Sequence, residues 1–159
     1  MQGFYHNIEY VRLQILGETA EKLILAVFLG GLIGLERQFR HKAAGLRTNM
    51  LICFGSAMFT VISAQMADKF GGDHTRIAAQ IIAGIGFLGA GTIIHAQGSV
   101  IGLTSAATIF VAAAVGMAAG AGLYATAIFA TVVVLIALVG LGRLEDYFER
   151  KHFPKYPPA

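Results

Sequence analysis

The chain has 159 residues, of which 56% are hydrophobic and only 13% are charged, and its mean hydropathy is +0.67. This composition excludes an ordinary soluble enzyme, because too little polar surface is present to cover a soluble core, and it predicts a membrane protein in contact with the lipid bilayer. The net charge of +3 is small, and we expect no nucleic-acid partner.

Runs without charge locate the predicted membrane spans. Residues 77–142 contain no Asp, Glu, Lys or Arg, and this length holds about three helices of roughly 20 residues each. Residues 48–67 are also uncharged, and the shorter apolar run 23–35 needs its flanks to reach across. The chain is expected to fold back within the glycine-rich stretch 116–122. The predicted spans lie at about 20–36, 48–67, 77–94, 101–117 and 122–142.

These spans predict an all-α membrane protein that forms a compact bundle of about five transmembrane helices. The expected organisation is an N-terminal extracytoplasmic segment at 1–19, the membrane domain at 20–142 and a short cytoplasmic tail at 143–159. Basic residues favour the cytoplasmic side of a membrane, and an outside N-terminus places eight inside and four outside. The inner set is Arg37, Arg40, Lys42, Arg47, Arg143, Arg150, Lys151 and Lys155, and the outer set is Arg12, Lys22, Lys69 and Arg76.

The stretch GIGFLGAG at 84–91 matches the G-x-G-x-x-G fingerprint of dinucleotide-binding proteins. That fingerprint needs a preceding strand and an acidic residue about 20 positions later. Position 104 is a threonine, and no acidic residue occurs between Asp73 and Glu145. The pattern therefore does not predict a nucleotide site, and we expect no cofactor.

Glycines instead favour close packing, because helices in a bilayer gain affinity from backbone contact through small residues. Their spacing on the third span spreads them around the helix, which predicts a central position in the bundle. The alternative is that this span unwinds and exposes backbone groups that bind an ion. The packing candidates are Gly30, Gly34, Gly84, Gly86, Gly89, Gly91, Gly116 and Gly120.

Polar residues gather at the two ends of the second span. At the cytoplasmic end, Glu36 can pair with Arg40, while Arg47, Thr48 and Asn49 open the next helix. This cluster is expected to be either an interfacial anchor or a gate or docking surface.

At the outer end, Asp73 stands where a helix N-cap belongs, followed by Arg76 and Gln80. The last two are expected to point into the bundle, where Gln80 makes either an interhelix hydrogen bond or a substrate contact. Cys53 is interpreted as a small packing residue.

Three ordered motifs make the sequence resemble the MgtC/SapB family of bacterial inner-membrane proteins, over roughly residues 20–142. They are GGLIGLERQFRHKAAGLRTNML at 30–51, DHTRIAAQIIAGIGFLGAGTII at 73–94 and VIGLTSAATIFVAAAVGMAAGAGLY at 100–124. The resemblance implies a multi-pass inner-membrane protein linked to magnesium limitation and, in pathogens, to survival inside host cells.

The resemblance further implies partners, because some members are thought to restrain an F-type ATP synthase or to assist a magnesium-transporting P-type pump. Longer members carry a cytoplasmic ACT-like domain, for which the 17-residue tail leaves no room, so the likeness is to a short form. Position by position, the motifs single out Glu36, Arg37, Arg47, Thr48, Asn49, Asp73, Arg76, Gln80 and Thr104.

The sequence leaves two alternative functions open. The first is a regulator that contacts a membrane partner and alters magnesium-linked ion homeostasis. The second is a transporter or channel, which five short helices would form more readily as a homo-oligomer. The spans lack carboxylates, whereas Mg²⁺ usually binds one or two of them with water. No nucleophile, phosphate loop or metal-ligand set predicts an enzyme.

Overall fold

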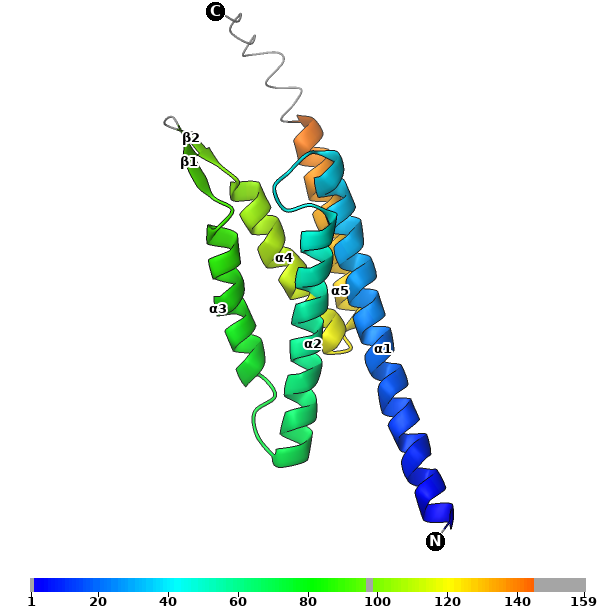
Figure 1. The fold of residues 1–159 in the computed structure, drawn as a ribbon. Helices are drawn as coiled ribbons and strands as arrows, with labels where there is room; N and C mark the ends of the chain where they lie inside the picture. The colour runs from blue at the N-terminus through cyan, green and yellow to red at the C-terminus, as the bar shows by residue number, and fades with distance from the viewer. Residues whose placement is uncertain (1, 97–98, 145–159) are drawn as a thin grey trace, which may run out of the picture.

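The computed structural model describes residues 2–96 and 99–144, with side chains for residues 15–94 and 100–144. Within these residues the chain forms five helices and one short hairpin (Figure 1). The elements are α1 (Gln2–Phe39), α2 (Leu46–Phe70), α3 (Arg76–Ala90), β1 (Ile94–Ala96), β2 (Ser99–Ile101), α4 (Leu103–Gly120), α5 (Tyr124–Ile136) and the π-helical turn η1 (Ala137–Leu141) that continues α5.

In the part of the chain that the structure describes, three helical segments are long and apolar enough to cross a membrane by themselves, namely Leu46–Phe70, Leu103–Gly120 and Tyr124–Leu144. At 1.5 Å per residue, the 25 residues of α2 extend about 37 Å, which exceeds a hydrocarbon core of roughly 30 Å. The chain is therefore a helical membrane protein. The orientation of its termini and the count of five spans stay predictions.

All five predicted helices are present, although their ends differ from the expected ones. Helix α1 is one continuous helix of 38 residues that runs through the expected boundary between 19 and 20. Its N-terminal part projects past the ends of the other helices (Figure 1). Residues 145–159, most of the predicted cytoplasmic tail, lie outside the described part of the chain.

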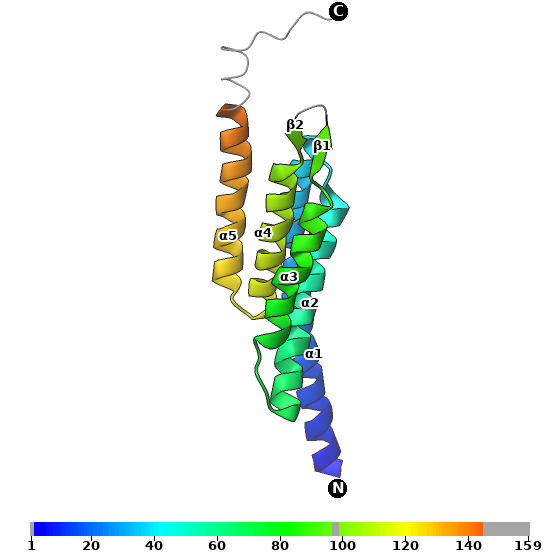
Figure 2. The ribbon, with the colours of Figure 1, turned by 90° about the vertical axis from the view of Figure 1, so that its left-hand side faces the viewer.

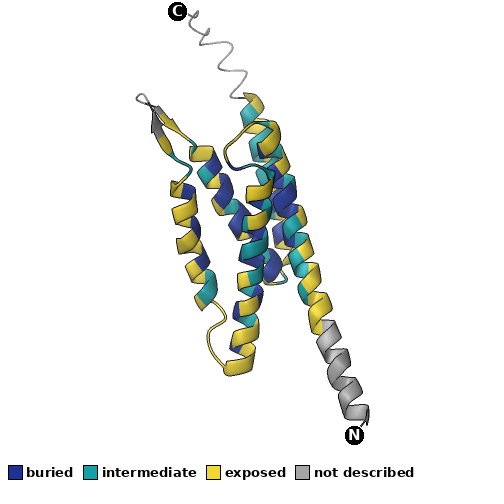
Figure 3. Ribbon diagram, viewed as in Figure 1, coloured by how far each residue is buried: buried dark blue, intermediate teal, exposed yellow. Residues whose placement is uncertain are grey.

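The third span was predicted to occupy the centre of the bundle, and this prediction is wrong. Helices α2 and α4 are central, because each packs along α1 and along the other, whereas α3 lies to one side against α2 and α4 (Figures 1 and 2). Burial follows the same division (Figure 3). The main core comprises Ala26, Leu29, Ile33, Cys53, Ala57, Val115, Ala119 and Ala127, from α1, α2, α4 and α5.

The third span also ends earlier than predicted, at Ala90 instead of residue 94. A turn follows, and Ile94–Ala96 pairs antiparallel with Ser99–Ile101. Glycine is a poor helix former, and the β-branched residues Thr92, Ile93 and Ile94 favour extended backbone. Gly102 then joins the hairpin to α4 at φ +97°, where any side chain would also collide with the carbonyl oxygen of Thr92.

The predicted reversal between the fourth and fifth spans is confirmed. Helix α4 ends at Gly120, and the turn at residues 121–123 leads into α5. The N–H of Leu123 donates to the carbonyl oxygen of Ala118 at 2.9 Å, which satisfies a free carbonyl of the last helical turn. Helices α4 and α5 consequently lie side by side and antiparallel (Figure 2).

Candidate functional site

The polar candidate residues other than Thr104 fall into two groups at opposite ends of α2. One group surrounds the loop between α1 and α2, and the other surrounds the loop between α2 and α3. These loops are separated by the length of α2, about 37 Å. The structure therefore does not bring the predicted residues together into one site.

The first group contains a buried ion pair at the C-terminal end of α1. The Nε of Arg37 donates to Oε2 of Glu36, and Oε1 of Glu36 lies 3.2 Å from Nε of Arg40. The Arg37 and Glu36 side chains are only 3% and 11% exposed, whereas that of Arg40 is 27% exposed. The predicted pairing of Glu36 with Arg40 is confirmed, and Arg37 completes the cluster in a position where an unpaired charge would be costly.

Asn49 is the second buried polar residue of this group. Its Nδ2 donates to the carbonyl oxygens of Ala44 and Gly45, both at 2.9 Å, and so holds the loop against the start of α2. Its Oδ1 and the Nη1 of Arg37 are both buried and have no hydrogen-bond partner among the described residues. This cluster therefore contains one buried acceptor and one buried donor that could each form a further hydrogen bond. The sequence did not predict this.

Arg47 and Thr48, in contrast, are exposed. Together with Lys42 and Gln38 they line an open hollow of about 600 Å³ on the surface of the α1–α2 loop. We call the surface formed by Gln38, Lys42, Arg47 and Thr48 the basic loop surface. The motif around residues 45–49 thus contributes one buried residue, Asn49, and two surface residues.

At the other end of α2, the predicted N-cap role of Asp73 needs correction. The N-cap residue of α3 is Thr75, and Asp73 lies two residues before it. Oδ1 of Asp73 accepts hydrogen bonds from the Thr75 hydroxyl at 2.6 Å and from the Thr75 N–H at 2.8 Å. These two bonds, the hydroxyl first, lower the pKa of the Asp73 carboxyl. Asp73 therefore closes the turn before α3 without capping the helix itself.

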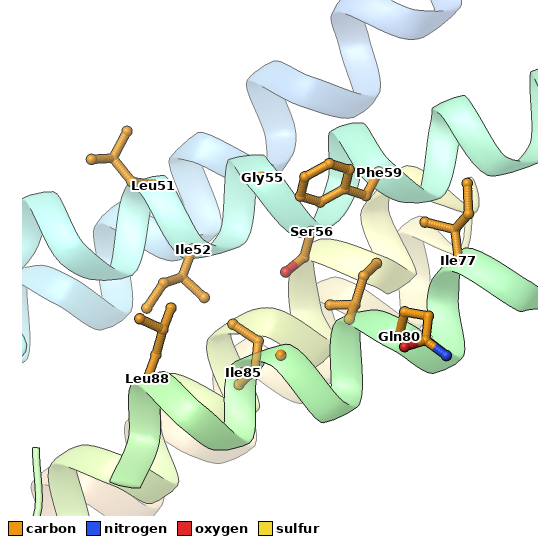
Figure 4. Close-up of a pocket in the computed structure, with 11 residues that line it drawn as sticks. Leu51, Ile52, Gly55, Ser56, Phe59, Ile77, Gln80, Ile85 and Leu88 are labelled. Atoms are coloured by element: carbon orange, nitrogen blue, oxygen red, sulfur yellow. The ribbon is translucent and has the colours of Figure 1, made fainter. Parts of the chain in front are cut away.

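Arg76 and Gln80 were predicted to point into the bundle, and this prediction is wrong. Both are exposed, and within the described residues the Gln80 side chain makes no hydrogen bond. Gln80 instead borders an open groove of about 500 Å³ between α2 and α3. We call it the α2–α3 groove; Ile52 and Ser56 of α2 face Ile85 and Leu88 of α3 across it (Figure 4). The residues that line the groove are Leu51, Ile52, Gly55, Ser56 and Phe59 of α2, and Ile77, Gln80, Ile81, Gly84, Ile85 and Leu88 of α3.

The glycines fall into two sets. On the closed side of α2, where α1 and α4 pack against it, they make tight backbone contacts; on the open side, at α3, they have free space around them. A Cβ at Gly30 would lie 2.6 Å from Cβ of Cys53, and one at Gly34 would lie 2.7 Å from Cα of Leu46. At Gly116 and Gly120 it would collide with the carbonyl oxygens of Cys53 and Ala57. These four positions bring α1 and α4 into backbone contact with α2.

On α3 the glycines have more room. No atom lies within 4 Å of a Cβ built at Gly84 or Gly86, and at Gly89 the nearest neighbour is Ala106 at 3.7 Å. A Cβ at Gly91 would meet only carbonyls of the preceding turn. The helix continues without interruption from Gly84 to Ala90, so the alternative of a helix unwound at Gly84, Gly86 and Gly89 is wrong in this structure.

Hydroxyl groups on the helices mostly bond to the backbone of their own helix. Thr108 donates to the carbonyl oxygen of Thr104 at 2.7 Å, and Thr104 itself is exposed in the first turn of α4. The sequence did not single out Ser63. Its buried hydroxyl donates a hydrogen bond to the carbonyl oxygen of His74 at 2.8 Å. This bond fixes the α2–α3 loop, and a serine inside an apolar span was its only sequence signal.

The sequence can now be compared with known proteins. The family model described as MgtC family matches residues 23–147. The chain belongs to the MgtC family. It is 52% identical over 120 residues to the protein MgtC of Brucella abortus. It is also 46% identical over 129 residues to YhiD of Escherichia coli K12, which is named as a candidate magnesium transporter.

These MgtC relatives are longer than the aligned region. The alignments cover 76% of this chain in both cases, but only 50% of the Brucella protein and 60% of the Escherichia coli protein. The chain thus spans about half to three fifths of the length of these relatives. No solved structure matches it.

Proposed function

We propose that this MgtC-family chain regulates magnesium-linked ion homeostasis by contacting another protein of the bacterial inner membrane, such as a cation pump or an ATP synthase. The observation that carries the proposal is the closed packing of α1, α2 and α4. At Gly34, Gly116 and Gly120 the backbones of these helices approach so closely that a methyl group would not fit. This packing favours a protein that acts through its surface over one that conducts ions through its centre.

The basic loop surface is the proposed contact on the cytoplasmic side. Lys42 and Arg47 are exposed beside each other around one hollow, and exposed cations in a shared surface attract an acidic partner. The buried pair of Glu36 and Arg37 lies at the end of α1 that leads into this loop. We assign the recognition of the partner to Lys42 and Arg47, and the shape of the loop to Glu36, Arg37 and Asn49.

Copurification from bacterial membranes after cross-linking tests the regulatory proposal. We expect a pump or synthase to copurify with the wild-type chain and to be lost with the double substitution Lys42→Glu and Arg47→Glu. The matched control is Lys22→Glu with Lys69→Glu, which reverses two charges at the far end of α2. Equal partner recovery from both double variants would refute the basic loop surface as the contact.

A transporter is the second candidate, and one structural observation favours it. Arg37 is 2% exposed, and charged groups buried within membrane proteins often mark ion pathways. The name of the Escherichia coli relative points the same way. Liposomes containing only the purified chain separate the two candidates. Mg²⁺ flux that Arg37→Gln abolishes and Arg47→Gln leaves unchanged would favour the transporter, whereas silent liposomes with a copurified partner favour the regulator.

A further inference from the structure

The α2–α3 groove is open and apolar, and no part of the described chain fills it. Its volume is about 500 Å³, and its walls are apolar apart from Ser56 and Gln80. Gly55 on one wall and Gly84 on the other have no atom within 4 Å of a built Cβ. The groove has the size of a small-molecule site, and one of its walls, α2, is long and apolar enough to cross a membrane.

A second hollow, with a larger polar share in its lining, adjoins the groove at the α2–α3 loop. This hollow has a volume of about 400 Å³ and shares Ile77 and Gln80 with the groove. Its lining adds Asp73 and Arg76, two charged residues of opposite sign. The combined cavity is therefore amphipathic, with an apolar length along the helices and a charged mouth at their ends.

The two charges at the mouth both have capacity for an outside partner. Both hydrogen bonds to Asp73 use Oδ1, so Oδ2 has no hydrogen-bond partner among the described residues. The Arg76 side chain likewise makes no hydrogen bond or ion pair within them. A ligand with one anionic and one cationic group would complement both side chains.

We propose that the α2–α3 groove and its mouth bind one phospholipid with a phosphate and a primary ammonium, as in phosphatidylethanolamine. An acyl chain would occupy the groove, the phosphate would face Arg76 and the ammonium would donate to Asp73. Charge complementarity favours this headgroup over that of phosphatidylglycerol, whose neutral glycerol brings no cation to Asp73. It also favours a primary ammonium over choline, which has no N–H to donate. This inference does not depend on the proposed regulatory function.

Lipid competition monitored by native mass spectrometry tests the proposal. The purified chain in mild detergent is mixed with equal amounts of phosphatidylethanolamine, phosphatidylcholine and phosphatidylglycerol with identical acyl chains. We expect one bound phospholipid, with phosphatidylethanolamine preferred about fivefold, the ratio that corresponds to one favourable charge interaction near a membrane surface. Asp73→Asn keeps an acceptor for Thr75 and should abolish this preference, whereas Arg76→Gln should weaken binding of all three lipids. Lys22→Gln is the control for loss of a cation at the same end of the molecule.

Glycine substitutions test the groove independently of the headgroup. Gly84→Leu should fill the groove and reduce bound phospholipid at least about fivefold, and Gly55→Leu should do the same from the opposite wall. Gly86→Leu is the matched control, because Gly86 has equal open space but does not line the groove. Unchanged thermal stability will show that the variants are folded.

Three outcomes would overturn the proposal. The first is equal phospholipid retention by Gly84→Leu, Gly55→Leu and the wild type. The second is an equal loss of lipid in the Gly86→Leu control. The third is a lipid-free dimer that becomes cross-linked through cysteines introduced at position 84, because a second copy of the chain would then occupy the groove.

Discussion

The two sides of α2 show how the same residue type serves opposite purposes. Towards α1 and α4, small residues allow helix backbones to touch, as at Gly30 and Gly116. Towards α3, Gly55 and Gly84 face open space and leave the α2–α3 groove between the helices. A glycine in a membrane helix therefore indicates either a contact or a cavity, and the neighbouring helix decides between the two.

The largest expected effect is on the free energy of unfolding, when a glycine on the closed side and one on the open side are each replaced by valine. Gly116→Val would drive a side chain into the carbonyl oxygen of Cys53, and we expect it to lower the free energy of unfolding by about 3 kcal/mol. Gly86→Val, with nothing near the new side chain, should change it by less than about 0.5 kcal/mol. Equilibrium unfolding in mixed detergent and dodecyl sulfate measures both. Similar losses in the two variants would contradict the distinction.

The buried ion pair provides the next test on the closed side. Arg37→Met removes the principal partner of Glu36, and we expect a loss of about 2 kcal/mol in the free energy of unfolding. The cost is limited because Arg40 still contacts Glu36 and because the unpartnered Nη1 of Arg37 is removed as well. Arg47→Met at the exposed position is the control. Equal stability of the two variants would show that burial at residue 37 does not matter.

A smaller effect is expected on the open side, where one hydrogen bond fixes the loop above the groove. Ser63→Ala removes the bond from the Ser63 hydroxyl to the His74 carbonyl, which should cost about 1 kcal/mol. Hydrogen exchange of the amides at residues 71–76 should also accelerate. Ser56→Ala is the matched control, because Ser56 is buried to the same 3% exposure and its hydroxyl makes no hydrogen bond within the described residues. Faster exchange in both variants would rule out the specific role of Ser63.

The smallest expected effect concerns the charge at the mouth of the groove. The Thr75 hydroxyl lowers the pKa of Asp73, so Thr75→Val should raise that pKa towards its ordinary value. Because the folded pKa lies below the unfolded one, Asp73 stabilises the fold fully above its unfolded pKa. The contribution is lost as the pH falls through the folded pKa. Carboxyl carbon shifts followed by NMR measure the titration, and an unchanged Asp73 pKa in Thr75→Val would exclude the hydroxyl as its main cause.

Much of this architecture follows from the sequence, because lipid imposes strict rules on helix length and charge. The charge-free run 77–142 and the uncharged residues 48–67 predicted membrane helices, and α2, α3, α4 and α5 lie there. The i,i+4 pair of Glu36 and Arg40 followed from helical spacing alone. The family signature likewise followed from ordered local motifs.

Other features depended on contacts between distant segments. The spread of glycines on α3 predicted a central helix, but its position at the side results from the closer fit of α4 against α2. The outward direction of Gln80 and the burial of Arg37 depend on which neighbour each helix face meets. The early end of α3 depends on a hairpin whose two strands pair across the turn.

The sequence by itself therefore determined the membrane setting, the existence of the five helices, the reversal after α4 and the family. Each of these follows from the hydrophobicity, charge and propensity of local segments. Only the tertiary structure decided which glycines make contacts, which charges are buried and where a groove remains open. Those properties depend on the distance between surfaces far apart in the chain, and local sequence patterns do not specify that distance.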